Sequence, residues 1–237
     1  MAEPELGRTF GRVADTYDRL RPAFAPEAID RAAAELGLGR GSVVLDLAAG
    51  TGRLTRPLRE RFAQVLAVEP DDEMRAHLGG DARAGFAEAI PLDDDSVDAV
   101  FVGDAFPWFE PDQALAEIRR VARPGGGLGL LWTDWWEGER PRIPAEFLEI
   151  LDEIWARFEQ LRRPAGDWRR HVQPDGEARY DETTRIAGRD LADLTLTASG
   201  PAYLEDAERA AIAERVYPLM EPEYELTVAT RVDWKRL

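Results

Sequence analysis

Short apolar runs alternate with amphipathic helical patterns along the first two-thirds of the chain. Apolar runs bounded by turn residues predict strands. They cover residues 42–47, 64–69, 97–102 and 128–133, with a short further strand at 82–86. Apolar positions spaced as on one helix face predict helices at 53–62, 71–78 and 112–122. Strands and helices that alternate in this way favour a parallel sheet with helices on both faces.

The two ends of the chain depart from this alternation. The first 36 residues hold two helical patterns, separated by Pro22 and Pro26. The last third predicts helices at 145–161, 188–198 and 203–218, and strands at 179–186 and 224–234. No internal repeat or low-complexity linker divides the chain. We therefore expect a single domain over residues 1–237, with an α/β core and helical decoration.

Composition excludes several classes of function. Thirty basic residues against 46 acidic ones give a formal charge of −16, which opposes binding to nucleic acid and to anionic membranes. The absence of cysteine excludes disulfides, zinc–thiolate sites and a cysteine nucleophile. With only His77 and His171, we expect no histidine-rich metal site. No apolar run is long enough to span a bilayer, and the first residues do not resemble a signal peptide, so we expect a cytoplasmic protein.

A glycine-rich turn follows the first predicted strand, with Gly50 and Gly52 after Asp46. Ligands of open parallel sheets bind at the carboxyl ends of the strands, where such a turn lets them approach backbone amides. A dinucleotide fingerprint would place glycine at position 48 and a small residue at position 53, but the chain has Ala48 and Arg53. No P-loop lysine follows either, so a nicotinamide cofactor is a distant alternative.

Two acidic residues narrow the ligand further. Asp46, just before the turn, would repel phosphate but suits an ammonium group. Glu69 ends the second predicted strand, where a carboxylate can accept both hydroxyls of a ribose. An ammonium group, a carboxylate and a ribose without phosphate together describe S-adenosylmethionine (SAM).

Six segments, in order, resemble the motifs of class I SAM-dependent methyltransferases of the small-molecule type (methyltransferase type 11-like). They are VADTYDRLRP (13–22), VVLDLAAGTG (43–52), VEP (68–70), GFAEAIPL with DDDSVDAV (85–100), DAFPWF (104–109) and LAEIRRVARPGGG (115–127). The resemblance covers residues 8–133 well and the rest loosely. It implies a Rossmann-like, doubly wound, seven-stranded and mostly parallel sheet with helical cap elements. It also implies an N-terminal lid at about 1–36, and cap helices at about 134–178.

The resemblance also assigns roles to individual residues. Asp46 would hold the methionine amino group, Glu69 the ribose, and Asp104 would lie beside the methionine end. Tyr17 and Arg21 would reach the methionine carboxylate or line the substrate entrance. The remaining cofactor contacts would come from the turn and from the adenine pocket, at Ala48, Gly50, Gly52, Pro70, Met74, Ala87 and Glu88.

The substrate would enter beside aromatic residues that follow the fourth and fifth predicted strands of this region, namely Phe106, Trp108, Trp132, Trp135 and Trp136. Asp104 and His171 are the candidate catalytic residues, although an exposed loop histidine is the simpler interpretation of His171. Three positions depart from the family pattern. Ala48 replaces a glycine, Phe86 stands where many relatives have aspartate, and Pro107 stands where a subgroup has histidine.

The expected activity is methyl transfer from SAM to an oxygen, nitrogen or carboxylate acceptor on a small molecule. Two alternatives stay open: a SAM-binding enzyme of the same fold that catalyses a non-methylating reaction such as a cyclisation, and a non-catalytic SAM-binding module. A homodimer is also left open.

Overall fold

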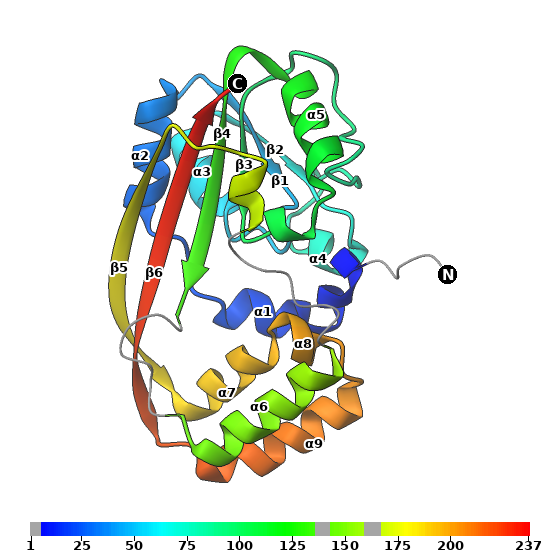
Figure 1. Ribbon diagram of the computed structural model, residues 1–237, viewed down its shortest axis with the longest axis vertical. Coiled ribbons are helices and arrows are strands. Elements are labelled where there is room, and N and C mark those ends of the chain that lie inside the picture. The colour runs from blue at the N-terminus through cyan, green and yellow to red at the C-terminus, as the bar shows by residue number, and fades with distance from the viewer. Residues whose placement is uncertain (1–5, 136–142, 159–166) are drawn as a thin grey trace.

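Six strands form a single sheet in the computed structural model, which describes residues 6–135, 143–158 and 167–237 (Figure 1). The strands are β1 (Val43–Leu47), β2 (Gln64–Val68), β3 (Val97–Gly103), β4 (Ala122–Asp134), β5 (Gly176–Ala187) and β6 (Glu223–Arg236). Their order is β2-β1-β3-β4-β6-β5. The pairs among β1 to β4 are parallel, whereas β6 runs antiparallel to both of its neighbours. The predicted α/β, mostly parallel core is therefore confirmed.

Helices and short 3-10 turns connect and cover these strands. The N-terminal elements are η1 (Leu6–Val13), α1 (Ala14–Leu20) and α2 (Pro26–Leu36). Those between the strands are α3 (Thr55–Arg61), α4 (Asp72–Ala76), η2 (Phe106–Trp108) and α5 (Pro111–Val121). The later ones are α6 (Ala145–Arg157), η4 (Asp167–Arg170), α7 (Gly188–Leu196), α8 (Ser199–Ala202), α9 (Asp206–Val216) and η5 (Tyr217–Leu219).

Alternating residues of β3 serve two separate hydrophobic clusters, one on each face of the sheet. Val100 and Val102 pack in the cluster that contains α5, and Ala99 and Phe101 pack in the cluster that contains α2 and α3. Successive side chains of a strand point to opposite faces, so a strand that is apolar throughout must be covered on both. The uninterrupted apolar runs therefore determine the doubly wound arrangement.

One predicted strand is reduced to a single bridge. Residues 82–86 contribute only an isolated parallel bridge, between Val68 and Arg83. The chain leaves β2 there because it folds back on itself at once, through the Phe86–Ala89 bridge. The described residues thus form a sheet of six strands, and the seventh expected strand is not formed.

The glycine run at 125–127 follows α5 and lies inside β4. Val97 pairs with Ala122, while Ala99 pairs with Gly127, so the intervening residues bulge out of the ladder. Gly125 has φ +77°, which side-chain-bearing residues rarely adopt, and a Cβ on Gly126 would lie 2.8 Å from the Arg123 carbonyl oxygen. Glycine is required at both positions for the bulge.

A second layer of helices lies beyond the carboxyl ends of the parallel strands. The long strands β5 and β6 extend past the core and reach α6, α7 and α9 (Figure 1). Of the expected cap segment at 134–178, α6 packs in this layer, and its partners α7 to α9 come from residues 188–216. In contrast, η4 places Trp168 in the hydrophobic cluster between the sheet and α5. We call α6 to α9 the cap.

Helix α1 lies between the sheet and the cap (Figure 1). On the sheet side, Asp18 pairs with Arg56 of α3 at 2.7 Å. On the cap side, Arg19 pairs with Asp190 of α7 at 2.8 Å. The N-terminal segment therefore connects the two layers.

Two absences hold for the described ranges. None of their helices is both long and apolar enough to cross a membrane. Within the same ranges, no group of three histidine or acidic residues could hold a metal ion.

The cap has its own apolar core, and Phe147 tests its contribution to stability. Phe147 is fully buried, whereas the next residue, Leu148, is 40% exposed. We expect Phe147→Ala to lower the free energy of unfolding by about 3–5 kcal/mol, because it leaves a cavity. Leu148→Ala should change it by less than about 0.5 kcal/mol. Urea unfolding followed by circular dichroism measures both; equal effects would contradict the burial of Phe147.

Candidate functional site

The glycine-rich turn surrounds a pocket at the carboxyl end of β1. Three residues of the turn have left-handed backbone: Ala48 (φ 57°), Gly50 (φ 56°) and Gly52 (φ 90°). A Cβ on Gly52 would lie 2.7 Å from Leu78, so the turn closes tightly there. The pocket is open to solvent and is lined by Tyr17, Phe24, Asp46, Ala48, Ala49, Gly50, Thr51, Arg53, Leu54 and Gly103.

Asp46 is a buried carboxyl group at the base of this pocket. Its side chain accepts a hydrogen bond of 2.5 Å from the Thr55 hydroxyl, at the start of α3. Burial raises the pKa of Asp46 to about 7, and the Thr55 bond opposes that rise. The group can therefore take up or release a proton close to neutral pH.

Glu69 joins the turn to the end of β2. Its Oε2 accepts from the Gly50 amide at 2.8 Å, and its Oε1 accepts from the Asp71 amide at 2.9 Å. Burial raises its pKa to about 7, with further upward contributions from the nearby Asp71 and Asp46 carboxylates. Each carboxylate oxygen keeps a second lone pair, so Glu69 can still accept two more hydrogen bonds.

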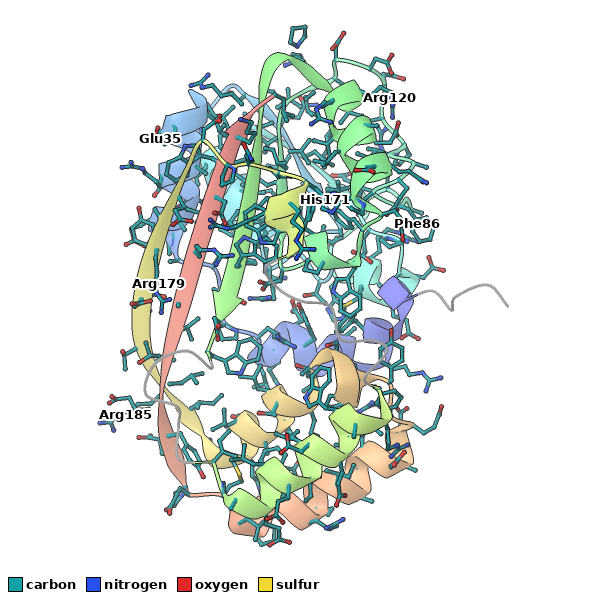
Figure 2. The ribbon with its side chains drawn as sticks, in the orientation of Figure 1. Glu35, Phe86, Arg120, His171, Arg179 and Arg185 are labelled. Atoms are coloured by element: carbon teal, nitrogen blue, oxygen red, sulfur yellow. The ribbon has the colours of Figure 1, made fainter. Side chains whose placement is uncertain are left out.

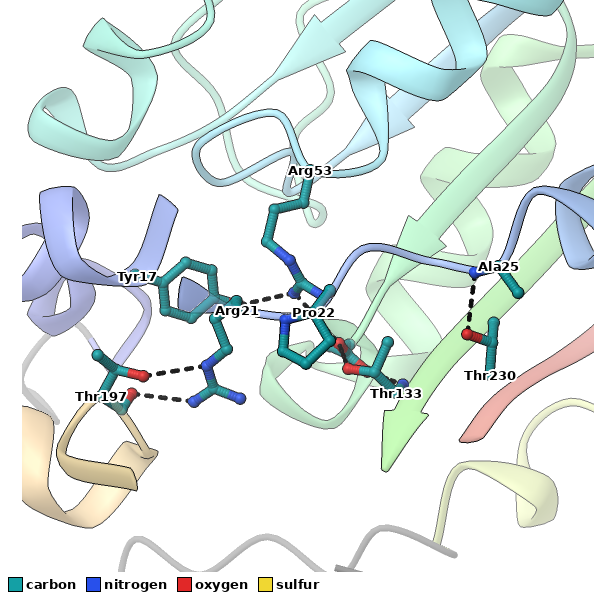
Figure 3. Close-up of polar contacts among 9 residues, drawn as sticks. Tyr17, Arg21, Pro22, Ala25, Arg53, Thr133, Thr197 and Thr230 are labelled. Carbon is teal, nitrogen blue, oxygen red and sulfur yellow. Dashed lines mark hydrogen bonds and ion pairs between the residues drawn. The ribbon is translucent and has the colours of Figure 1, made fainter. Parts of the chain in front are cut away.

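Asp104, Arg53 and Thr133 form the opposite side of the site. Asp104 has φ 56°, and its carboxylate accepts from the Thr133 amide at 2.7 Å and from the Thr133 hydroxyl at 2.6 Å. One terminal nitrogen of Arg53 lies 3.5 Å from the Asp104 carboxylate, and the other donates to the Pro22 carbonyl (Figure 3). Asp104 is thus held by β4 and by the turn together.

The N-terminal segment covers the pocket from above. Tyr17 lines it, and the Arg53 guanidinium lies 5.6 Å from the centre of its ring. Gly11 packs so closely on Asp71 that a Cβ there would lie 2.6 Å from the carboxylate. Arg21 points toward the cap, where it donates to the Thr197 hydroxyl and carbonyl (Figure 3).

The residues expected around adenine lie beside β2 and α4. Met74 and Ala87 are buried, Pro70 is half-buried, and the Glu88 carboxylate accepts from the Glu110 amide at 2.7 Å. Phe86 is 44% exposed and lies at the surface (Figure 2).

The aromatic residues expected to meet substrate are divided among different places. Phe106 is buried in the sheet core, and Trp108 packs edge-on against Phe10 at 5.8 Å. Trp132 stacks on Trp168 at 5.2 Å. Trp135 packs against the cap, in the cluster that contains Leu191 and Leu194. Trp136 lies outside the described residues.

His171 does not line the pocket. Its Nδ1 lies 3.4 Å from Asp112, on the first turn of α5 (Figure 2).

Sequence reasoning missed two threonines that hold site residues. Thr133, which anchors Asp104, directly follows an apolar run and could have been found as the polar end of a predicted strand. Thr197 lies 176 positions from Arg21, and no sequence pattern connects them.

Comparison with known proteins shows that this chain is similar to methyltransferases. Residues 45–130 match a family model described as a methyltransferase domain. An uncharacterised methyltransferase of Mycobacterium tuberculosis is 48% identical over 134 residues, which are 54% of this chain and 54% of that protein. An uncharacterised methyltransferase of Schizosaccharomyces pombe is 38% identical over 134 residues, which are 54% of this chain and 53% of that protein.

Residues 45–130 therefore form a methyltransferase domain.

Solved structures share the fold of the methyltransferase domain over most of its length. A protein assigned as a type II methyltransferase from Anaeromyxobacter dehalogenans matches 91% of this chain and 97% of its own, with 23% identity and a TM-score of 0.58. The structure of a [4+2]-cyclase matches 96% of this chain and 94% of its own, with 19% identity and a TM-score of 0.53. In sequence, the chain spans about half the length of the curated relatives it matches.

The backbone of Ala48 allows a test of the turn in the methyltransferase domain. A left-handed φ costs a residue with a side chain about 1–2 kcal/mol, a cost that glycine avoids. After the greater flexibility of glycine in the unfolded chain is subtracted, we expect Ala48→Gly to raise the free energy of unfolding by about 0.5–1 kcal/mol. Ala49→Gly is the matched control and should lower it, because position 49 has no positive φ. A loss of stability in Ala48→Gly would argue against this turn geometry.

Proposed function

We propose that this chain transfers a methyl group from SAM to a small-molecule acceptor. The observation that carries the proposal is Glu69, a buried carboxylate bonded to the Gly50 amide at the edge of a pocket that glycine backbone leaves open. SAM is the cofactor of this domain family, and the pocket has the groups that SAM requires. Asp46 lies just before the turn, Glu69 bonds to the Gly50 amide within it, and no P-loop lysine follows the glycines.

We assign the residues in and around the pocket the roles that the resemblance to methyltransferases implies. Asp46, buried beside Gly50 and Gly52, would hold the ammonium group of the cofactor. Glu69 would accept the ribose hydroxyls on the lone pairs left free by its two amide bonds. Pro70, Met74, Ala87 and Glu88 would surround adenine, and Ala48 and Tyr17 would complete the methionine end.

When bound, SAM supplies an electrophilic methyl group on a positively charged sulfur; the acceptor lone pair bonds to the methyl carbon while the methyl–sulfur bond breaks, which leaves S-adenosylhomocysteine. The chain's contribution is to orient the acceptor and to exclude water, and orientation alone can supply several kcal/mol of such a barrier. The α1 segment, paired with α3 through Asp18 and with α7 through Arg19, would exclude water from above.

No strong base is needed when the acceptor is already a nucleophile at neutral pH, as a carboxylate or an amine is. Asp104 holds Thr133 and lies near Arg53, so its role is to position the site. His171 meets Asp112 on α5, and we assign it no proton transfer.

Calorimetric titration with SAM, S-adenosylhomocysteine and NAD tests the proposed cofactor. We expect micromolar binding of the first two and none of NAD. Glu69→Gln should weaken S-adenosylhomocysteine binding at least about tenfold, because the amide cannot match a charged acceptor for two hydroxyls. Glu60→Gln is the control, since that carboxylate is 78% exposed on α3 and should leave binding unchanged. Absence of binding by the unmodified protein would overturn the proposal.

Affinity for S-adenosylhomocysteine should depend on pH. Asp46 and Glu69 have pKa values of about 7, raised by burial, so both are largely protonated in the free protein at pH 6. An ammonium group and ribose hydroxyls bind the ionised forms, so we expect affinity to rise at least about tenfold from pH 6 to pH 8. The stability of the ligand-free protein depends on pH in the opposite direction to the affinity. The pKa values in the folded protein lie above the ordinary values of 3.8 for aspartate and 4.5 for glutamate, so the free protein loses stability as pH rises from about 4 through 7. A flat affinity profile would contradict the assigned roles.

Methyl transfer is separated from the alternatives by its product. Incubation with SAM and an acceptor yields S-adenosylhomocysteine only if the methyl group leaves the sulfur. A cyclase of the same fold, or a binding module, would retain SAM.

A further inference from the structure

Arg21 is a half-buried cation between the sheet and the cap, and its guanidinium lies within cation–π distance of two aromatic rings. Its guanidinium carbon lies 4.4 Å from the centre of the Trp135 ring and 4.8 Å from that of the Tyr17 ring. Nε donates to the Thr197 hydroxyl at 3.1 Å, and Nη2 donates to the Thr197 carbonyl at 3.0 Å. These four contacts fix the orientation of the group. Figure 3 shows the remaining nitrogen of Arg21 without a hydrogen-bond line.

The positive charge of Arg21 is not neutralised by a carboxylate. Among the described residues, no acidic side chain lies within ion-pair distance of it. The charged groups that act on it are Arg53, which adds positive charge, and Asp104, whose carboxylate already accepts from Thr133 and lies near Arg53. Two guanidinium groups thus face one carboxylate. Burial lowers the pKa of Arg21, so its charge is held at a free-energy cost that a bound anion would offset.

A second unsatisfied donor lies on the same stack. The indole nitrogen of Trp135 is buried and has no hydrogen-bond partner among the described residues, and Trp135 itself is 5% exposed. Buried donors in folded proteins are nearly always bonded, so an orphaned one points to a ligand. A negatively charged hydrogen-bond acceptor would therefore satisfy both the Trp135 N–H and the Arg21 guanidinium.

We propose that Arg21 and Trp135 form a carboxylate-binding subsite between sheet and cap, and that the methyl acceptor is an organic acid. This inference rests on the proposed function and adds its substrate class. A carboxylate has the size and the planar, two-oxygen geometry that suit a guanidinium edge. The apolar part of the acid would lie against the neighbouring aromatic rings.

The methionine carboxylate of the cofactor is the competing partner for Arg21. Arg53 lines the pocket at the glycine-rich turn, whereas Arg21 is not among its lining residues and is bonded to Thr197 of the cap. We therefore assign Arg21 to the acceptor.

Matched acid and amide probes test the subsite. The pairs are phenylacetate with phenylacetamide, indole-3-acetate with indole-3-acetamide, and octanoate with octanamide. Each is titrated by calorimetry into the full-length protein saturated with S-adenosylhomocysteine. For at least one pair, we expect the acid to bind at least tenfold more tightly than its neutral amide. Equal binding of acid and amide in every pair, or no binding by any acid, overturns the proposal.

Three variants locate the preference for the acid. Arg21→Gln should bring the acid-to-amide ratio close to one, and Trp135→Phe, which keeps a ring but removes the N–H, should lower it about threefold. Arg19→Gln is the matched control: it removes an equal charge from the same helix, at a residue that pairs with Asp190, and should keep the ratio. Circular dichroism checks that each variant is folded. If either site variant keeps the full preference, the subsite is elsewhere.

The cofactor measurement separates this inference from the proposed function. Arg21→Gln should change S-adenosylhomocysteine affinity by less than threefold. If the variant loses cofactor and acid binding together, Arg21 holds the methionine carboxylate and the inference fails, while the proposed function stands. If the unmodified protein binds no S-adenosylhomocysteine, the proposed function itself has failed.

Discussion

The Glu69 carboxylate connects the parts on which the site depends. One oxygen accepts from Gly50 in the turn after β1, and the other accepts from Asp71 after β2. Asp71 in turn caps α4 by accepting from the Glu73 and Met74 amides. A buried carboxyl group is costly unless it is bonded, and these amides lie at points where strands end and cannot bond to a neighbouring strand. One side chain thereby sets the turn, the start of α4 and the pocket wall together.

The N-terminal segment provides the second constraint, because it belongs to neither layer and contacts both. Asp18 and His77 connect α1 to the sheet side, and Arg12 and Arg19 connect the segment to the cap. Exposed ion pairs of this kind contribute little stability each, typically about 0–1 kcal/mol. The N-terminal segment therefore joins the two layers through several contacts that are each weak.

Charge is distributed unevenly within a strongly acidic chain. The whole chain has a formal net charge of −16, yet Arg21 and Arg53 lie near each other between sheet and cap, where the carboxylate that acts on Arg21 is that of Asp104. A local excess of positive charge inside an acidic protein is unfavourable unless a ligand neutralises it. It distinguishes this interface from exposed arginines such as Arg157, which pairs with Glu208.

The amino-acid sequence by itself determined the α/β core and the edge of the sheet at which the candidate site lies. Apolar runs, glycine at 50 and 52, and acids at 46 and 69 are local patterns, and the carboxyl edge of a parallel sheet brings such positions together whatever the rest of the chain does. The sequence did not determine that residues 82–86 form a bridge and not a strand, because strand pairing depends on the path of the chain after it. Nor did it reveal which aromatic residues share a surface. Only the tertiary structure placed Thr197 on Arg21 and separated Trp135 from Trp132, since contacts between positions far apart in the chain arise from the packing of whole helices and strands and leave no periodicity in the sequence.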